Sequence, residues 1–136
     1  MPARILARIA GEIAVCKKCA LCESRKRAVA GEGPADAEIL FIGEGPGFHE
    51  DEQGRPFVGA SGRFLDQLLE QAGLKRADVF IANVVKCRPP GNRRPEPEET
   101  DACIPYLHEQ LAVVDPKVIV ALGNTAVGTL LGTKLG

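Results

Sequence analysis

The chain has 136 residues, 45% of them hydrophobic and 26% charged, and its formal net charge is −1. This length is typical of a single domain with a modest core, and the near-neutral charge argues against a protein that is basic over its whole surface. No apolar run approaches the roughly 18 residues of a membrane-spanning helix, and the N-terminus mixes arginines into its apolar stretch, unlike a secretion signal. These features predict one domain, residues 1–136, in the cytoplasm and without a membrane anchor.

The hydrophobic pattern predicts helices that alternate with strands. We expect a helix over 1–15 with an apolar stripe of Ile5, Leu6, Ile9 and Ile13, a strand over 39–42 and a loop over 43–59. A helix capped by Ser61 should follow to about Ala72 and bury Phe64, Leu65, Leu68 and Leu69, and a strand over 79–85 comes next. The remaining expected elements are a proline-rich irregular stretch over 87–99, a helix from Thr100 to about Val113, a strand over 118–122 and a short helix over 125–131.

This alternation is typical of α/β folds in which helices cover both faces of a central parallel sheet. Ligands of such sheets bind beyond the C-terminal ends of the strands. Glu44 follows the first predicted strand, Asn83 lies at the end of the second, and Gly123 follows the third. We therefore expect these residues at one edge. Three strands make a thin sheet that a fourth would complete, so we expect the sequence to be part of a longer protein.

The five cysteines are an odd number in a chain without a secretion signal, which argues against a disulfide framework. Clustered thiols in such a chain more often bind a metal, and four thiolates suit either a structural zinc ion or a [4Fe–4S] cluster. The wide spacing of Cys87 and Cys103 differs from the tight pairs of a zinc ribbon, which weakens the zinc interpretation but does not remove it. Buried, inert cysteines are the remaining alternative.

The segment Gly43–Gly47, GEGPG, follows the first strand but matches neither the dinucleotide-binding fingerprint nor a P-loop. Its glycines allow a ligand to approach the backbone closely, whereas the carboxylates that follow argue against a phosphate-binding loop. Asp51 and Glu52 are typical of a solvated loop. Glu44, at the end of a strand, is either a functional carboxylate or another surface charge.

Phe57 and Asn83 each have two interpretations. Phe57 lies in a short apolar segment within a polar loop, and is either a core residue or a platform on which a base stacks. Asn83 interrupts an apolar strand, and its amide either makes a structural hydrogen bond or reads the edge of an amide-like ring. Basic residues flank the cysteines over 17–27 and 86–94, where they form either a solvated surface or a contact face for phosphates.

Taken together, these motifs resemble those of the family 4 uracil-DNA glycosylases, iron–sulfur enzymes of bacteria and archaea. The resemblance runs from about Cys16 to Gly132 and rests on the ordered segments CKKCALCESR, ILFIGEGPG, GRPFVGASGRFLDQLL, NVVKCRPPGNRRP, Cys103 and VIVALGNTA. It implies a three-layer α/β/α fold, one [4Fe–4S] cluster, and hydrolysis of the N-glycosidic bond of uracil in deaminated DNA, which begins base excision repair. The implied partner is uracil-containing DNA, bound by a monomer that associates with the nucleoid; no protein partner is implied.

The site residues that the resemblance implies form two groups. The cluster ligands would be Cys16, Cys19, Cys87 and Cys103, in loops around 16–22 and 87–103, with Cys22 as a cysteine that is not a ligand. In the pocket, Phe57 would stack on the flipped-out uracil, Asn83 would hydrogen-bond its edge, Glu50 would lie near C5 to exclude the methyl group of thymine, and Glu44 with the backbone of Gly43 and Gly45 would line the base and sugar end. Glu44 and Asn83 are the catalytic candidates, because a carboxylate can orient water and a donor can stabilise the uracil anion.

Two departures from the family pattern shape the expected function. The final motif of the family, a strand that ends in a His-Pro pair, is absent, so we expect a C-terminally truncated member. The loop after the second strand is short and has no His, unlike that of a related branch, which argues against covalent capture of DNA. Gly45 stands where other branches of the superfamily carry the Asp that activates water, so Glu44 is the candidate for that role here. The alternative function is a catalytically weak or inactive, metal-stapled module that binds DNA or accompanies a polymerase; a zinc-stabilised structural domain is a third hypothesis.

Overall fold

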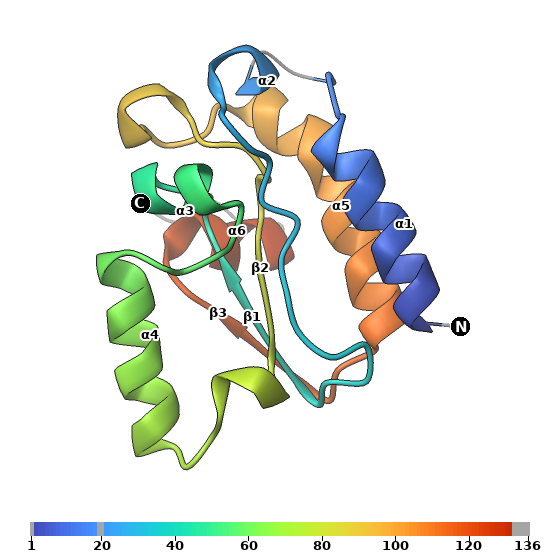
Figure 1. Cartoon of the computed structure of the whole chain (residues 1–136), viewed down its shortest axis with the longest axis vertical. Helices are drawn as coiled ribbons and strands as arrows, with labels where there is room; N and C mark the ends of the chain where they lie inside the picture. The colour runs from blue at the N-terminus through green and yellow to red at the C-terminus, as the bar shows by residue number, and fades with distance from the viewer. Residues whose placement is uncertain (1, 19–20, 132–136) are drawn as a thin grey trace.

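The structure is a computed structural model that describes residues 2–18 and 21–131. Its elements in chain order are the helices α1 (Pro2–Ala14) and α2 (Leu21–Ser24), strand β1 (Ile39–Gly43), helices α3 (Phe48–Gln53) and α4 (Ala60–Gln71), the 3-10 turn η1 (Arg76–Asp78), strand β2 (Phe80–Asn83), the 3-10 turn η2 (Pro90–Asn92), helix α5 (Pro97–Val114), strand β3 (Val118–Ala121) and helix α6 (Asn124–Leu131) (Figure 1). Among the described helices, none is both long enough and apolar enough to cross a membrane.

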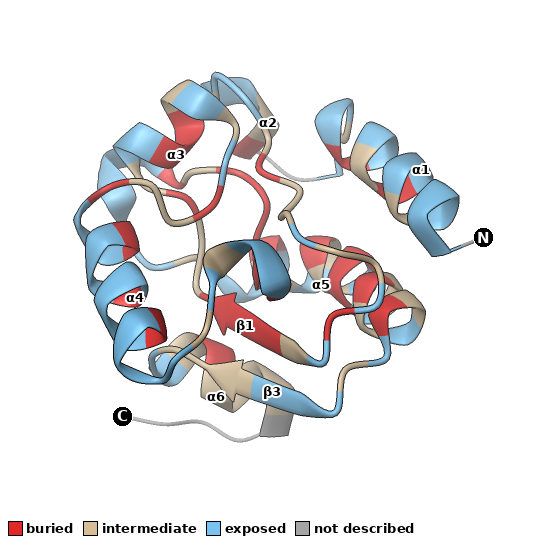
Figure 2. Cartoon of the chain, turned by 60° about the horizontal axis from the view of Figure 1, so that its bottom comes forward, coloured by how far each residue is buried: buried red, intermediate tan, exposed pale blue. Residues whose placement is uncertain are grey.

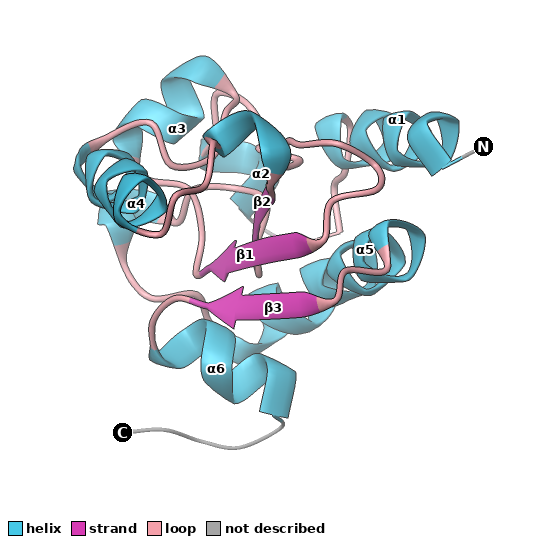
Figure 3. Cartoon of the chain, turned by 90° about the horizontal axis from the view of Figure 1, so that it is seen from below, coloured by secondary structure: helices cyan, strands magenta, loops and turns pink. Residues whose placement is uncertain are grey.

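The three strands form one parallel sheet in the order β2-β1-β3. Gly43 at the end of β1 pairs with Asn83 at the end of β2, so both residues lie at the same edge of the sheet. The parallel arrows of β1 and β3 and the helices on either side of them are visible in Figure 3. The predicted α/β class with a central parallel sheet is therefore confirmed.

Two apolar clusters hold helices against opposite faces of the sheet. On one face, Leu40 and Ile42 of β1 pack with α1 and α5, and on the other face Phe41 packs with Leu65 and Leu69 of α4. Because successive residues of a strand point to opposite faces, the central strand is buried on both sides (Figure 2). Each such side chain contributes roughly 1.5–3 kcal/mol of burial free energy, which anchors β1 beside the site.

The N-terminal helix is anchored by two residues of its predicted stripe. Ile9 and Ile13 are completely buried and belong to the cluster that includes Leu107 and Val114 of α5. Ile5 is 36% exposed, so the stripe contacts the core mainly through the second half of α1. The two helices run side by side in Figure 1.

The segment 43–59 is not a continuous loop, which corrects one expectation. It contains α3, whose first turn is fixed where the Glu50 carboxylate accepts the backbone N–H of Gly47, and which ends at Gly54 in the left-handed region (φ 71°). The density of charged residues that indicated a loop is explained by burial of two of them, Glu50 and Asp51. Asp51 accepts backbone N–H groups of Lys26 (2.8 Å) and Arg27, so its expected place in a solvated loop is also wrong.

The boundaries and burial of two helices also differ from expectation. Helix α4 begins at Ala60 with Gly59 as its cap, one residue before Ser61, and helix α5 begins at Pro97 rather than Thr100. Two residues expected in the core, Phe64 and Leu68 of α4, are 61% and 37% exposed. They line a cavity instead of packing on the sheet.

Candidate active site

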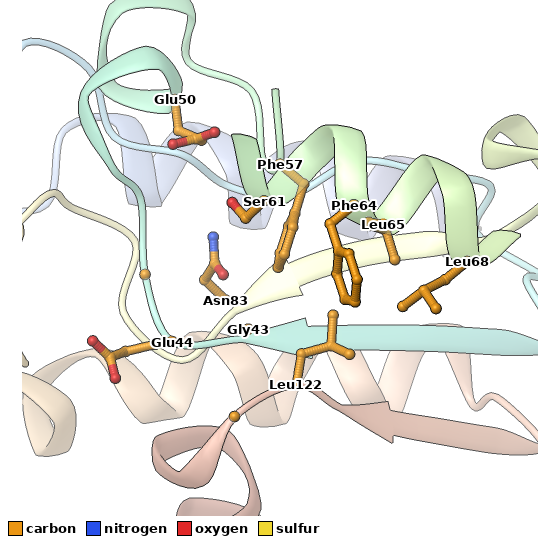
Figure 4. Close-up of a pocket in the computed structure, with 12 residues that line it drawn as sticks. Gly43, Glu44, Glu50, Phe57, Ser61, Phe64, Leu65, Leu68, Asn83 and Leu122 are labelled. Carbon is orange, nitrogen blue, oxygen red and sulfur yellow. The ribbon is translucent and has the colours of Figure 1, made fainter. Parts of the chain in front are cut away.

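All six pocket residues predicted from the sequence line one cavity of about 380 Å³ at the C-terminal edge of the sheet. They are Gly43, Glu44, Gly45, Glu50, Phe57 and Asn83 (Figure 4). This location is the one in which parallel α/β sheets bind ligands. Phe64, Leu68 and Leu122 add an apolar wall that the sequence reasoning did not assign to the pocket.

Gly43 forms the floor of the cavity, where a side chain would not fit. A Cβ atom at this position would lie 2.4 Å from the ring of Phe57 and 2.6 Å from Oδ1 of Asn83. The missing side chain therefore lets an aromatic face and an amide approach the end of the central strand together, which the pattern GEGPG alone did not reveal.

Asn83 carries the amide that is best placed to recognise a ligand. The residue is 2% exposed, and its Oδ1 is a buried acceptor with no hydrogen-bond partner in the described part of the chain. An unsatisfied buried acceptor costs roughly 1–3 kcal/mol. A ligand that offers an N–H inside the cavity would remove this cost.

Phe57 reaches the cavity from an unusual backbone conformation. Its φ of 52° lies in the left-handed region, which a bulky non-glycine residue adopts only when its surroundings hold it there. In Figure 4 the ring extends from the α4 side toward Gly43 and Asn83. Phe57 lines the cavity and also packs against the apolar cluster that contains Phe41 and Leu65, so both interpretations of this residue agree with the structure.

Glu50 ties the loop that carries Phe57 to helix α3. One carboxylate oxygen accepts the backbone N–H groups of Val58 (2.9 Å) and Gly59 (2.8 Å), and the other accepts that of Gly47 (2.9 Å). Burial raises the pKa of the Glu50 carboxyl, but the backbone donors outweigh burial and lower it below its ordinary value. The side chain is therefore an anion at neutral pH whose hydrogen-bonding capacity is largely used by the protein itself.

Glu44 is held at the end of the cavity that faces helix α6. The hydroxyl of Thr125 donates to Oε2 of Glu44 at 2.6 Å, and the carboxylate points away from Phe57 and Asn83 in Figure 4. The sequence analysis did not assign Thr125 to the site. Its position just after β3, at the same sheet edge as Glu44, could have indicated that the two residues lie close together.

A second, polar cavity of about 170 Å³ adjoins the first. The two share Glu44, Gly45, Glu50 and Ser61, and the second extends to Asn92 and Arg93 on the loop after β2. Arg93 is already paired through both guanidinium nitrogens with Glu99 at 2.8 Å, which fixes it at the start of α5. The combined space runs from an apolar slot to a polar mouth.

Three of the four predicted cluster cysteines, Cys16, Cys87 and Cys103, lie in one region of the structure although they are far apart in the sequence. Arg25 donates to Sγ of Cys87 at 2.9 Å and lies near Cys16 and Cys22. Cys16 packs against the core cluster that contains Cys103, and burial together with a hydrogen bond to Cys16 raises the pKa of the Tyr106 hydroxyl.

The remaining predicted ligand, Cys19, lies outside the described residues. Within the described ranges, no group of three or more His, Cys, Asp or Glu side chains is arranged to hold a metal ion. Cysteine thiolates are soft donors of the kind that iron–sulfur clusters and zinc prefer.

Lys86 is a buried cation that sequence reasoning had grouped with the basic surface residues. It is 1% exposed, and its ammonium group donates to the backbone oxygen of Asn83 (2.9 Å) and to Oε1 of Gln110 (2.7 Å). Burial lowers its pKa to about 8. Lys86 therefore supports the end of β2 from within the core.

The uracil DNA glycosylase superfamily matches residues 30–136, and the chain belongs to this superfamily. Within it, the sequence is similar to type-4 uracil-DNA glycosylases, which confirms the family resemblance. It is 55% identical to the type-4 uracil-DNA glycosylase of Sulfurisphaera tokodaii over 120 residues, 88% of this chain and 54% of that protein. It is 51% identical to that of Thermotoga maritima over 119 residues, 88% of this chain and 62% of that protein.

The chain thus spans a little over half the length of the curated relatives that it matches. A more distant similarity, 30% identity over 105 residues, connects 76% of the chain with 11% of a DNA polymerase of Bacillus phage SP01. The similar region is a small part of that much longer protein.

Proposed function

We propose that this chain carries the uracil pocket of a uracil-DNA glycosylase, which hydrolyses the N-glycosidic bond of uracil in deaminated DNA and begins base excision repair. The observation that carries the proposal is the convergence of six predicted residues on one cavity at the sheet edge, in a chain that is 51–55% identical to type-4 uracil-DNA glycosylases. We propose further that residues 1–136 form one domain of a monomeric protein, located in the cytoplasm and associated with the nucleoid through its DNA substrate.

The proposed binding mode follows from the shape of the cavity. A base inside a duplex is out of reach, so uracil must rotate out of the stack and enter the pocket. There the ring of Phe57 would stack on its face, and Oδ1 of Asn83 would accept the N–H between its two carbonyl groups, which satisfies the buried acceptor. Glu50, which lines the pocket, would limit space near C5, where thymine carries a methyl group.

The chemical step needs stabilisation of two opposite charges. When the bond between C1′ and N1 breaks, negative charge develops on uracil and positive charge on the sugar. The amide of Asn83 and the backbone around Gly43 and Gly45 would contact the uracil anion. Glu44, held by the hydroxyl of Thr125, would orient water and stabilise the sugar cation.

We propose that the polar cavity next to the pocket accepts the DNA backbone. Arg93 and Asn92 lie at its mouth and Ser61 lies between the two cavities. A guanidinium group held by Glu99 keeps its fixed geometry while it contributes positive potential near a phosphate.

We propose that Cys16, Cys19, Cys87 and Cys103 hold a [4Fe–4S] cluster. The support is the donor set: three thiols from distant segments share one region with Arg25 and Tyr106. Such a cluster, when bound, would supply structural cross-linking, because it would join the segment after α1 to the loop after β2 and to α5. The pocket residues would carry the reaction.

The alternative function is a metal-stapled module that binds DNA or accompanies a polymerase without turnover. The similarity to a phage DNA polymerase is the observation that favours it. The two functions differ in one measurable property, since only the glycosylase releases free uracil.

The test is uracil release from a uracil-containing oligonucleotide, with the chain purified without oxygen. We expect release, and we expect Asn83→Ala to lower its rate by roughly 10²–10³, as removal of a group that stabilises developing charge does. Gln67→Ala, which truncates an exposed amide of α4, serves as the matched control and should release uracil at the wild-type rate. Folded wild-type protein that binds the oligonucleotide but frees no uracil would favour the alternative, and an Asn83→Ala rate near wild type would contradict the pocket assignment.

A further inference from the structure

Phe57 occupies a backbone conformation that it would not adopt unaided. Its φ of 52° places Cβ close to the following carbonyl, which is unfavourable for an L-residue. The same conformation directs the ring against Gly43 and Asn83. Contacts elsewhere in the protein must therefore stabilise this peptide, and they identify the groups that shape the pocket.

One of these groups is Arg76, which lies in the 3-10 turn η1 behind the loop. Its Nη1 donates to the backbone oxygen of Phe57 at 2.8 Å and its Nη2 donates to that of Pro56 at 2.5 Å. A planar guanidinium can contact two consecutive carbonyls in this way, because its donors diverge in a fixed fork. The ammonium group of a lysine lacks this fork geometry.

The guanidinium of Arg76 is itself held in place from two sides. Nη1 also contacts Oδ1 of Asp66 at 3.2 Å, and Nε lies 3.7 Å from Oε2 of Glu32. Glu32 in turn pairs with Arg55 through hydrogen bonds of 2.9 and 2.8 Å. The Arg76 side chain is only 23% exposed, so these contacts fix a partly buried group rather than a mobile surface arginine.

The opposite side of the same loop is held by Glu50. Its carboxylate accepts the N–H groups of Val58 and Gly59, directly after the two carbonyls that Arg76 binds. Four consecutive residues, 56–59, are thus fixed by one cation through their oxygens and by one anion through their nitrogens. Arg76 faces a separate cavity of about 320 Å³ behind the loop, whereas Glu50 faces the pocket.

We propose that Arg76 is a positioning residue that holds the 56–57 peptides in the conformation that makes the Phe57 ring a wall of the pocket. The expected effect on uracil release rests on the proposed function, whereas the expected effect on the conformation of the loop does not. Arg76 has no contact with the pocket itself, so it acts on a bound base only through Phe57.

The test is Arg76→Lys, which keeps the positive charge near Asp66 and Glu32 but loses the two-carbonyl fork. We expect amide hydrogen exchange to accelerate at least about tenfold at Val58 and Gly59, the factor that one lost hydrogen bond predicts, without change in β1 or α5. We expect kcat/KM for uracil release to fall by a similar factor. The matched control is Arg63→Lys, because Arg63 is an exposed arginine that lines the same rear cavity.

A double-mutant cycle separates positioning from a general structural role. If Arg76 acts through the ring, Arg76→Lys should lower kcat/KM much less in a Phe57→Ala background than in the wild type. Additive effects of Arg76→Lys and Phe57→Ala on kcat/KM would overturn the proposal. It would also be overturned if Arg76→Lys had the same amide exchange rates and the same kcat/KM as the control Arg63→Lys.

A second variant covers the case in which Arg76→Lys folds poorly. Glu32→Gln keeps Arg76 and weakens one of the contacts that orient its guanidinium, together with the Glu32–Arg55 pair, and it should accelerate exchange at residues 58 and 59 by a smaller factor. Unchanged exchange at these amides would overturn the proposal. If the wild-type chain releases no uracil, the proposed function fails, while the exchange measurements still decide the role of Arg76.

Discussion

At the scale of single residues, the pocket depends on two positions that have no side chain. Gly43 admits the ring of Phe57 and the amide of Asn83, and Gly62 admits the backbone of Phe57. A Cβ at Gly62 would lie 2.0 Å from the carbonyl oxygen of Phe57 and 2.3 Å from its carbonyl carbon. The first turn of α4 and the strained loop are therefore in direct backbone contact.

We predict opposite effects for two glycine-to-alanine substitutions in helices. Alanine is favoured over glycine in a helix by about 1 kcal/mol, and around Gly11 of α1 there is open space, so Gly11→Ala should stabilise the protein by about that amount. Gly62→Ala should destabilise it by about 1–3 kcal/mol, because overlap with backbone atoms cannot be relieved by a change of rotamer.

Urea denaturation of both variants measures this difference, and uracil release should fall for Gly62→Ala alone. Stabilisation by Gly62→Ala would mean that the Phe57 loop does not pack on the first turn of α4.

At the scale of elements, the short helix α3 connects two segments through one carboxylate. Glu50 accepts backbone N–H groups from the residue before the helix and from the loop before α4. The bonds favour its ionised form, and its pKa in the folded protein lies below the ordinary value of 4.5. Its contribution to stability is therefore fully present above about pH 4.5 and is lost as the pH falls through the folded-state pKa.

We predict that Glu50→Gln lowers the free energy of unfolding by roughly 1.5–3 kcal/mol at pH 7, the range for hydrogen bonds to a charged group. The difference from wild type should shrink as the pH falls below 4.5, since protonation removes the same charge from the wild-type protein. Urea titrations at a series of pH values between 7 and 3.5 measure the difference. Glu52→Gln, on the exposed side of the same helix and paired with Lys26, is the control and should have little effect. A difference that is independent of pH would contradict the ionised, hydrogen-bonded state of Glu50.

The sequence predicted the larger elements well because their apolar residues repeat at regular spacing. The strands, α1, α4 and the α/β class follow from such patterns, and the motifs named the residues that line the pocket. Helix α3 and the burial of Asp51 were missed because their partners are backbone N–H groups elsewhere in the chain, which leave no trace in a pattern of side chains. Arg76 was missed for the same reason, since its main partners are two carbonyl oxygens.

At the scale of the whole molecule, the thiol region joins parts of the chain that are far apart in sequence. Arg25 donates both to Sγ of Cys87 and to the backbone oxygen of Ala14 at the end of α1. Helix α1 also packs on α5, which carries Cys103. A metal centre held by cysteines from all three segments would therefore fix the N-terminal helix, the loop after β2 and α5 to one another, on the side of the sheet opposite to α4.

The proposed [4Fe–4S] cluster predicts the metal content of cysteine variants. Cys87→Ala should lose nearly all of the roughly four iron atoms per chain expected for such a cluster, and should yield much less folded protein because binding free energy contributes to folding. Cys22→Ala removes a half-buried cysteine of the same region that we do not assign as a ligand, and should keep its iron. Iron and sulfide analysis of protein purified without oxygen, with far-UV circular dichroism, measures both effects. If the wild-type protein contains zinc but no sulfide, the site binds zinc and not an iron–sulfur cluster. If Cys87→Ala keeps the iron content of the wild type, Cys87 is not a ligand.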